Sequence, residues 1–210
     1  MDEPVVKRVV AFFDGQNLFH AAREAFGYSC PNYDVRKLTA RVCASKGWTV
    51  EEARFYTGVP DCSDNPTWNH FWTHKLAMLG RQGVKNFSRP LRYRNRRIKL
   101  PNGTEHTYLA GEEKGIDVRI AIDIIRMAHL KRYDIALIFS QDQDLSEVAE
   151  EIRDISLEQS RWIKIASAFP VSPTSRNIRG VEKTDWITID RTLYDSALDT
   201  RDYRIKARPR

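Results

Sequence analysis

The sequence contains no hydrophobic run long enough to cross a membrane. The stretch Val5–Phe13 is mostly apolar, but it is shorter than the roughly 18 apolar residues that a bilayer-spanning helix requires. It also makes a poor secretory signal, because Asp2 and Glu3 stand where a basic leader would be needed. We therefore expect a soluble cytoplasmic protein with no membrane partner.

Cysteine is scarce. The three cysteines, Cys30, Cys43 and Cys62, are separated by 13 and 19 residues, which is not a zinc-binding pattern. An odd number of cysteines also argues against a framework of disulfide bonds. We expect reduced thiols that are buried or half-buried.

Acidic residues are absent from one long segment of the chain. No Asp or Glu lies between Arg81 and Thr104, where eight basic residues occur: Arg81, Lys85, Arg89, Arg92, Arg94, Arg96, Arg97 and Lys99. Phe87 and Tyr93 are interleaved with them. Arginine contacts phosphate and exposed aromatic rings stack on unpaired bases, so we expect the basic residues from Lys85 to Lys99 to bind single-stranded RNA. A solvated hairpin that resists aggregation is the alternative.

The composition is that of a globular protein. The chain has 210 residues, of which 41% are hydrophobic and 30% are charged, and its net charge is +6. Neither repeats nor a low-complexity linker divide it, so we expect one domain over residues 1–198. The polar residues 199–210 are rich in Arg and Lys and are expected to form a flexible basic tail.

Strand-like and helix-like segments alternate along the chain. Val5–Phe13 and Asp134–Phe139 have the composition of strands buried on both faces. Further strands are expected at Ala53–Val59, Trp162–Ala168 and Trp186–Ile189, and helices at Gln16–Phe26, Val35–Lys46 (with Asp34 as its N-cap), Thr67–Arg81, Ile116–Leu130, Leu145–Ile155 and about Arg191–Leu198. This order predicts an α/β fold, a doubly wound and mostly parallel sheet with helices on both faces.

A basic β-hairpin is expected to be inserted into this order at about residues 85–109. Leu91–Leu100 resembles a strand, and Pro101-Asn102-Gly103 has the composition of a turn. His106–Leu109 would then pair back as the second strand.

Aspartates lie at the points where a site is expected in such a fold. Asp14 follows the first buried strand, Asp142 and Asp144 follow the strand Asp134–Phe139, and Asp117 begins the long helix. Sites of open α/β sheets form beyond the carboxyl ends of the strands. Converging carboxylates favour Mg²⁺ or Mn²⁺ over zinc. Each aspartate taken alone is also explained as the N-cap of the next helix.

Three blocks of residues resemble the signature blocks of NYN domains, which are relatives of PIN-domain nucleases. They are Phe13–Leu18 (FDGQNL), Lys114–Val118 (KGIDV) and Phe139–Leu145 (FSQDQDL). The resemblance covers Val5 to about Ala168. It implies that Asp14, Asp117, Asp142 and Asp144 are catalytic metal ligands and that Asn17 lines the site. The third block departs from the common Ser-Gly-Asp-x-Asp-Phe, because Gln141 replaces the glycine and Leu145 the phenylalanine.

The resemblance implies a ribonuclease, an endonuclease dependent on Mg²⁺ or Mn²⁺, in which Lys114 could neutralise a substrate phosphate. One alternative is an RNA-binding or regulatory NYN-like protein with little turnover. Another is a phosphatase acting on small phosphate esters, which also uses Asp-x-Asp and Mg²⁺. A phosphatase of the haloacid-dehalogenase type would carry Asp-x-Asp directly after the first strand, where this chain has Asp14-Gly15-Gln16, so this alternative ranks low. The helix Thr67–Arg81 could also support a homodimer through its free surface.

Overall fold

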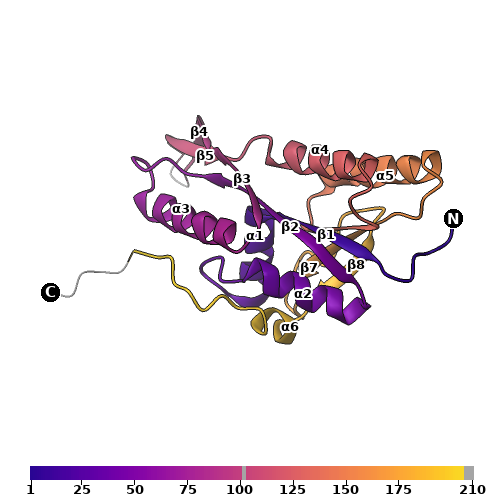
Figure 1. Cartoon of the computed structure of the whole chain (residues 1–210). Coiled ribbons are helices and arrows are strands. Elements are labelled where there is room, and N and C mark those ends of the chain that lie inside the picture. Colours follow the sequence, from indigo (N-terminus) through magenta and orange to yellow (C-terminus); the bar gives the residue numbers. More distant parts are fainter. Residues whose placement is uncertain (101–102, 206–210) are drawn as a thin grey trace.

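A six-stranded sheet forms the centre of the molecule in the computed structural model, which describes residues 1–100 and 103–205 (Figure 1). The strand order is β3-β2-β1-β6-β7-β8, and every pair of neighbours is parallel. The strands are β1 (Arg8–Asp14), β2 (Thr49–Val59), β3 (Lys85–Pro90), β6 (Ile135–Phe139), β7 (Lys164–Pro170) and β8 (Asp185–Ile189). The order reverses between β1 and β6, so the sheet is doubly wound as expected.

Helices cover both faces of the sheet (Figure 1). The core on one face includes residues of α1 (Gly15–Phe26), α2 (Val35–Lys46), α3 (Pro66–Arg81) and α6 (Arg191–Asp195). The core on the other face includes residues of α4 (Ile116–His129) and α5 (Ser146–Glu158). Strand β1 contributes to both, because alternate side chains of a strand point to opposite faces. Val9, Ala11 and Phe13 enter the first core, and Val10 and Phe12 the second.

Short polar side chains begin the first three helices. Asp14, Asp34 and Asn65 accept hydrogen bonds from the backbone N–H three residues further on, which satisfies one of the free donors of each first turn. The expected capping role of Asp34 is confirmed. Gly27 and Gly47 end α1 and α2 in the left-handed conformation that glycine adopts without strain.

The hairpin begins later in the chain than the sequence suggested. It consists of β4 (Arg92–Lys99) and β5 (Glu105–Glu112), which pair antiparallel and form a separate two-stranded sheet. The preceding segment, placed in the insertion by the sequence analysis, is instead the edge strand β3 of the main sheet and pairs with β2. Phe87 holds it there by packing against Tyr56. The expected turn includes Pro101 and Asn102, which lie outside the described residues.

Strand β2 starts four residues before the expected Ala53. Its first residues, Thr49 to Glu51, are exposed, and Glu52 is half-buried. The sequence did not indicate a strand over these residues, because two glutamates there interrupt the apolar pattern that is typical of a buried strand.

The segment after Leu198 is packed against the domain, contrary to the flexible tail that we expected. The Asp199 backbone N–H donates to the Asn32 carbonyl at 2.7 Å. Tyr203 is only 9% exposed and lies edge-on to Phe71, with 5.8 Å between the ring centres. Burial of this aromatic ring holds the segment in place. Residues 206–210 lie outside the described part of the chain.

The three cysteines are free thiols, as expected. Cys43 is buried and Cys30 is half-buried, but Cys62 is exposed, contrary to the expectation, because it lies in the polar loop before α3. Among the described residues, no helix combines the length and the apolar character needed to span a membrane.

Candidate active site

Asp14 lies at the switch in strand order, at the carboxyl end of β1. It is only 6% exposed. Its Oδ1 accepts a hydrogen bond from the Asn17 backbone N–H at 3.0 Å, and Ser140 Oγ lies 3.5 Å from its Oδ2. Asp14 therefore caps helix α1 and faces the end of β6 at the same time. The capping role and the predicted site role are both compatible with this position.

The turn after β6 is held by hydrogen bonds to neighbouring elements. Asn17 Oδ1 accepts from the Gln141 backbone N–H at 2.8 Å, which ties α1 to this turn. Ser140 Oγ accepts from the Asp142 backbone N–H at 3.1 Å. Gln141 is buried and its side chain donates to the carbonyls of Asn177 and Arg179. The residue that replaces the common glycine thus anchors a neighbouring loop, and its φ is not positive, so no glycine is required there.

Asp117 meets Asp14 and Asp142 at a small cavity. It lies in the first turn of α4, after Gly115, which has φ 73°. The cavity measures 260 Å³, and its lining includes Asp14, Lys114, Asp117 and Asp142. Three of the four predicted aspartates are therefore brought together from β1, α4 and the turn after β6.

Asp144 is not part of this lining. It is exposed and lies in the single turn of 3₁₀ helix Gln143–Leu145, which precedes α5. Its backbone N–H donates to Asp142 Oδ1 at 3.1 Å. Leu145 is buried as the apolar anchor of this turn, whereas Asp144 lines neither of the cavities that Asp142 borders. Asp144 therefore lies next to Asp142 but outside the lining that the other three aspartates share.

Glu113 is a site residue that the sequence analysis did not select. It lines the cavity that contains Asp117 and also an adjoining cavity of 430 Å³. Its Oε1 accepts a hydrogen bond from the backbone N–H of Gly58, near the end of β2. In the sequence Glu113 is one of two glutamates in a polar loop, and no local pattern distinguishes it from Glu112.

The larger cavity opens toward helix α1 and the base of the hairpin. Its lining includes Gln16, Asn17 and His20 of α1, and Leu91 and Gly111 at the ends of the hairpin strands. Asp14, Glu113 and Asp142 line both cavities. Asn17 therefore lines the larger cavity, and the three carboxylates lie where the two cavities adjoin.

Burial raises the proton affinity of two of these carboxylates. The pKa of Asp14 is raised to about 6, mainly by loss of solvent and further by the nearby Asp142, while hydrogen bonds from the Asn17 and Gln16 backbones oppose the shift. The pKa of Glu113 is raised to about 7, again mainly by burial, with Asp14 and Asp117 adding repulsion. A cation bound among these groups would relieve both effects.

The donor set fits a hard divalent cation. Carboxylate oxygen is the ligand that Mg²⁺ and Mn²⁺ prefer. Four carboxylates line the smaller cavity: Asp14, Glu113, Asp117 and Asp142. In the described part of the chain, no three His, Cys, Asp or Glu side chains stand close enough to enclose an ion. The carboxylates line a cavity wall instead, so an ion there would keep several water ligands, as Mg²⁺ commonly does in proteins.

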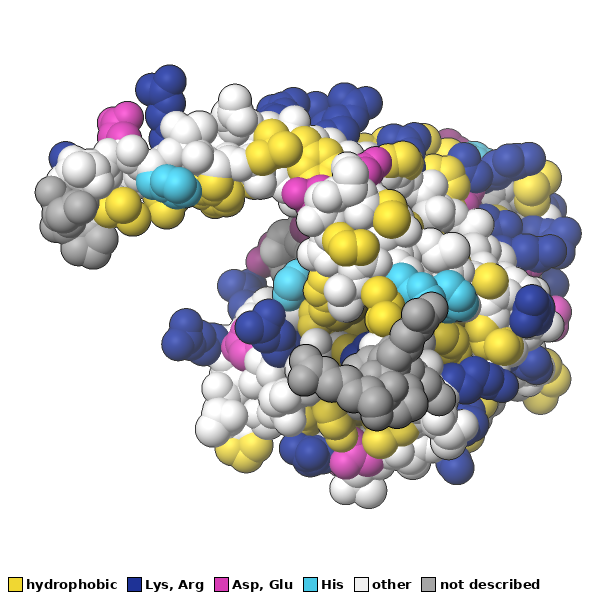
Figure 2. All heavy atoms as spheres, turned by 90° about the vertical axis from the view of Figure 1, so that its left-hand side faces the viewer, with side chains coloured by type: hydrophobic (Ala, Val, Ile, Leu, Met, Phe, Trp, Pro, Cys, Tyr) yellow, Lys and Arg dark blue, Asp and Glu magenta, His cyan; other side chains and the backbone are white. Residues whose placement is uncertain are grey.

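The predicted RNA-binding residues do not form one surface. Because side chains alternate along a strand, Arg92, Arg94 and Arg96 share one face of the hairpin, together with Tyr108 opposite Arg96. Arg97 and Lys99 occupy the other face. In Figure 2 the hairpin extends from the body as an arm, and the molecule is hollowed beneath it.

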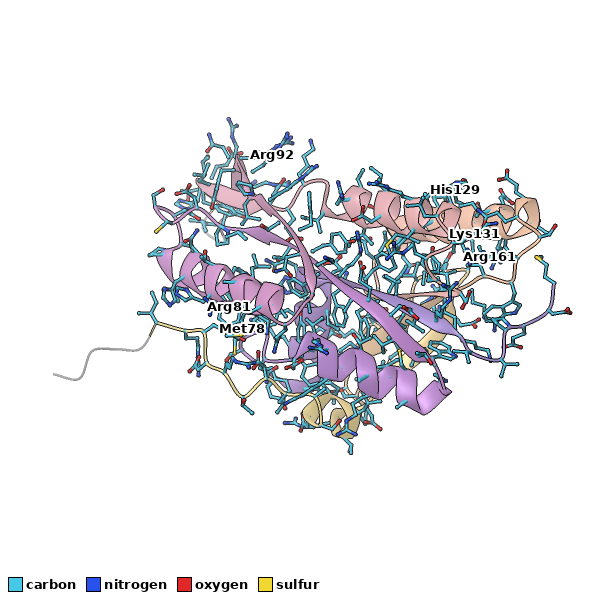
Figure 3. The ribbon with its side chains drawn as sticks, in the orientation of Figure 1. Met78, Arg81, Arg92, His129, Lys131 and Arg161 are labelled. Atoms are coloured by element: carbon cyan, nitrogen blue, oxygen red, sulfur yellow. The ribbon has the colours of Figure 1, made fainter. Side chains whose placement is uncertain are left out.

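The other basic residues are scattered over the molecule. Some border the acidic cavities, and others lie far from them. Lys114 lines the smaller cavity, and the Arg89 guanidinium occupies the space that a side chain at Gly115 would need. Lys85 begins the edge strand β3. Figure 3 shows Arg92 on the hairpin, whereas Lys131 and Arg161 lie near the opposite end of the molecule. The positive charge is therefore not confined to the candidate site.

This doubly wound sheet, with its acidic site at the switch in strand order, defines an α/β protein of the PIN-like kind. The chain belongs to the NYN domain family, because a family model for the NYN domain matches residues 8–168. The family is related to nucleases, and all three predicted signature blocks lie within the matched range. No curated protein matches the chain.

One solved structure supports the fold. A protein of unknown function from Vibrio parahaemolyticus has a TM-score of 0.51 and 21% identity, with 94% of this chain and 99% of that chain covered. A deacetylase–teicoplanin complex has a TM-score of 0.30 and 17% identity, over 75% of this chain and 68% of that chain. The first similarity concerns the fold alone, and the second is too weak to support an argument.

Proposed function

We propose that this chain is a metal-dependent ribonuclease that hydrolyses phosphodiester bonds within single-stranded RNA, acting as an endonuclease. The observation that carries the proposal is the meeting of Asp14, Asp117 and Asp142 around one cavity, although they come from β1, α4 and the turn after β6. Membership in a nuclease-related family supports the same conclusion.

Asp14 and Asp142 are the proposed direct ligands of Mg²⁺ or Mn²⁺, and Asp117 is a ligand either directly or through water. When bound, such an ion lowers the pKa of a water and stabilises the charge that develops on the phosphoryl oxygens. Asn17 and Ser140 keep Asp14 and the turn after β6 in register through their hydrogen bonds. Asn17 thus acts by positioning the carboxylates.

Basic side chains beside the cavity are the proposed contacts of the substrate phosphate. Lys114 lines the cavity with Asp117, and Arg89 reaches Gly115 at its edge. A phosphate would otherwise be repelled by the clustered carboxylates. We propose that Lys114 and Arg89 offset this repulsion when RNA is bound.

The hairpin is the proposed guide for the RNA strand. Its base residues Leu91 and Gly111 form part of the wall of the 430 Å³ cavity, which adjoins the acidic site. The face that bears Arg92, Arg94 and Arg96 also presents Tyr108, which is exposed and can stack on an unpaired base. This combination of cations and an aromatic ring favours single-stranded RNA over a rigid duplex.

The test is cleavage of end-labelled single-stranded RNA with Mn²⁺ or Mg²⁺, comparing wild type with Asp142→Asn. Internal products that require metal and wild-type protein support the proposal. Asp154→Asn, a change on the exposed surface of α5, is the matched control and should cleave as wild type does. Equal products from wild type and Asp142→Asn would reveal a contaminating nuclease or a misplaced site.

A non-cleaving RNA-binding protein is the second candidate. It is favoured by one observation: the carboxylates line a wall and do not enclose an ion. Salt-dependent RNA binding by wild type without any metal-dependent product would replace the ribonuclease with this function.

A further inference from the structure

Glu113 holds a central position between the two cavities. Their linings share three side chains, Asp14, Glu113 and Asp142. Asp117 lines only the smaller cavity, and Asp144 lines neither. The carboxylates that border both hollows are therefore two predicted aspartates and one glutamate that no sequence pattern selected.

The position of Glu113 is fixed by the end of strand β2. Its Oε1 accepts a hydrogen bond from the Gly58 backbone N–H. A Cβ atom at position 58 would lie 2.6 Å from Glu113 Cγ and 2.8 Å from its Oε1. The absence of a side chain at Gly58 thus makes room for this carboxyl group. Because carboxylate oxygens have several lone pairs, the hydrogen bond leaves capacity for a cation.

The neighbouring glutamate has a different role. Glu112 ends β5, and its Oε1 accepts from Arg96 Nε at 2.7 Å on the hairpin. Glu113 turns the other way, to the main sheet. Glu112 therefore bonds within the hairpin and Glu113 bonds to the main sheet. A change at Glu112 is a matched control for the same change at Glu113.

We propose that Glu113 takes the place expected for Asp144 in binding the divalent cation, and contacts it directly or through a water beside Asp14 and Asp142. The inference rests on the proposed metal-dependent function. It further assigns Gly58 as a positioning residue, since its N–H and its lack of a side chain hold the Glu113 carboxylate at the wall between the cavities.

Glu113→Gln separates this role from a purely structural one. The amide oxygen of Gln can still accept the hydrogen bond from Gly58, so the link between hairpin and sheet is kept while the negative charge is lost. We expect the melting temperature in EDTA to stay close to that of wild type, and the Kd for Mn²⁺ to rise at least tenfold. Glu112→Gln and Asp144→Asn should change this Kd less than twofold.

The experiment is calorimetric titration of the full, metal-free chain with MnCl₂ at pH 8, with Asp14→Asn included. If Glu113→Gln binds Mn²⁺ as wild type does while Asp14→Asn does not, the inference on Glu113 is overturned and the proposed function stands. If wild type binds no Mn²⁺, the proposed function and the inference both fall. Should Glu113→Gln not fold, Gly58→Ala decides: it keeps the carboxylate but displaces it, and unchanged Mn²⁺ affinity overturns the inference.

Discussion

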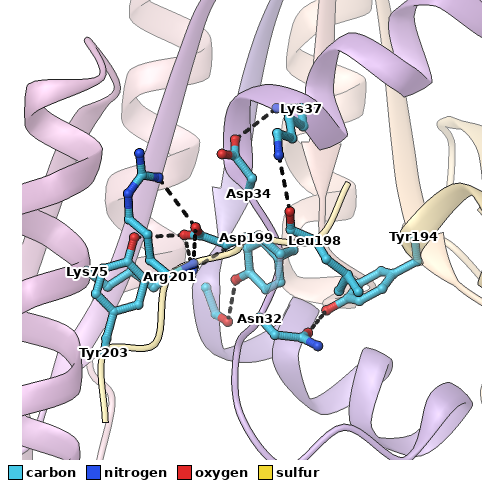
Figure 4. Close-up of polar contacts among 11 residues, drawn as sticks. Asn32, Asp34, Lys37, Lys75, Tyr194, Leu198, Asp199, Arg201 and Tyr203 are labelled. Atoms are coloured by element: carbon cyan, nitrogen blue, oxygen red, sulfur yellow. Dashed lines mark hydrogen bonds and ion pairs between the residues drawn. The ribbon is translucent and has the colours of Figure 1, made fainter. Parts of the chain in front are cut away.

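The ammonium group of Lys75 lies 3.8 Å from the carboxylate of Asp199, inside the protein (Figure 4). Lys75 is 0% exposed although it belongs to helix α3. Its Nζ donates to the Tyr33 carbonyl at 2.9 Å and lies 5.2 Å from the centre of the Tyr203 ring. Burial lowers the pKa of Lys75 to about 8, against the attraction of Asp199. A buried charge pair therefore joins α3 to the segment after Leu198.

Lys75→Met should destabilise the protein strongly. The change removes the ammonium partner of the buried Asp199 carboxylate, which keeps only Arg201, at 3.4 Å, as a cationic neighbour. Breaking a buried ion pair costs about 3 kcal/mol or more. Urea denaturation measures this free energy of unfolding. The double variant Lys75→Met/Asp199→Asn should recover part of the loss, because the buried negative charge at position 199 is then removed as well. Lys37→Met, on the exposed surface of α2, is the control, and a loss in Lys75→Met no larger than in this control would contradict the role assigned to the pair.

The two aspartates of the Asp-x-Asp pair should differ in importance. Asp142→Asn removes a side chain that lines both cavities and should lower the cleavage rate at least a hundredfold. Asp144→Asn changes an exposed side chain outside both linings, and its rate should stay within about fivefold of wild type. Single-turnover cleavage of labelled RNA measures both rates. Equal losses in the two variants would mean that the turn after β6 rearranges when metal binds.

The two faces of the hairpin should contribute unequally to RNA binding. Arg92→Glu/Arg94→Glu reverses two charges on the face that carries Tyr108, whereas Arg97→Glu/Lys99→Glu reverses two on the opposite face. We expect the first pair to weaken binding at least tenfold more than the second. Each lost phosphate contact lowers the slope of log K against log salt by about 0.7 for a single strand. Fluorescence anisotropy at several salt concentrations measures affinity and slope, and identical results for the two pairs would refute the assignment of the face.

The metal-free protein should lose stability as pH rises through the pKa of Asp14. This pKa is about 6 in the folded protein, above the ordinary 3.8, so the folded state binds the proton more tightly than the unfolded state does. Stability from this group is therefore present at low pH and lost as pH rises through 6. Between pH 5 and 8 the loss is on the order of 1 kcal/mol, because pH 5 lies about one unit below the folded pKa.

Asp14→Asn isolates this contribution from other titrating groups. The stability of the variant relative to wild type should increase as pH rises from 5 to 8 in EDTA. The raised pKa of Glu113, about 7, also lowers the stability as pH rises, and it does so in both proteins. Chemical denaturation at each pH measures the difference. A constant difference across this range would show that Asp14 is not protonated near pH 6.

The sequence by itself determined the main strands and the residues at their ends. Buried parallel strands are apolar throughout, so Asp14 after β1 and the turn that holds Asp142 were visible as polar interruptions of apolar runs. Asp34 was visible as an N-cap because it precedes a helix-like segment, and the fold class was visible in the alternation of strand-like and helix-like segments. These features depend on residues close together in the chain, and local patterns encode them directly.

Only the tertiary structure decided which carboxylates meet. Glu113 reaches Gly58, 55 residues earlier in the chain, because β5 ends beside the carboxyl end of β2. Asp144 lies outside the lining of both cavities, and the pairing register of β4 and β5 separates Arg94 from Arg97. Burial of Lys75 and Tyr203 holds a segment that its composition marked as a tail. Such outcomes depend on which distant surfaces pack together, and no local pattern of polarity contains that information.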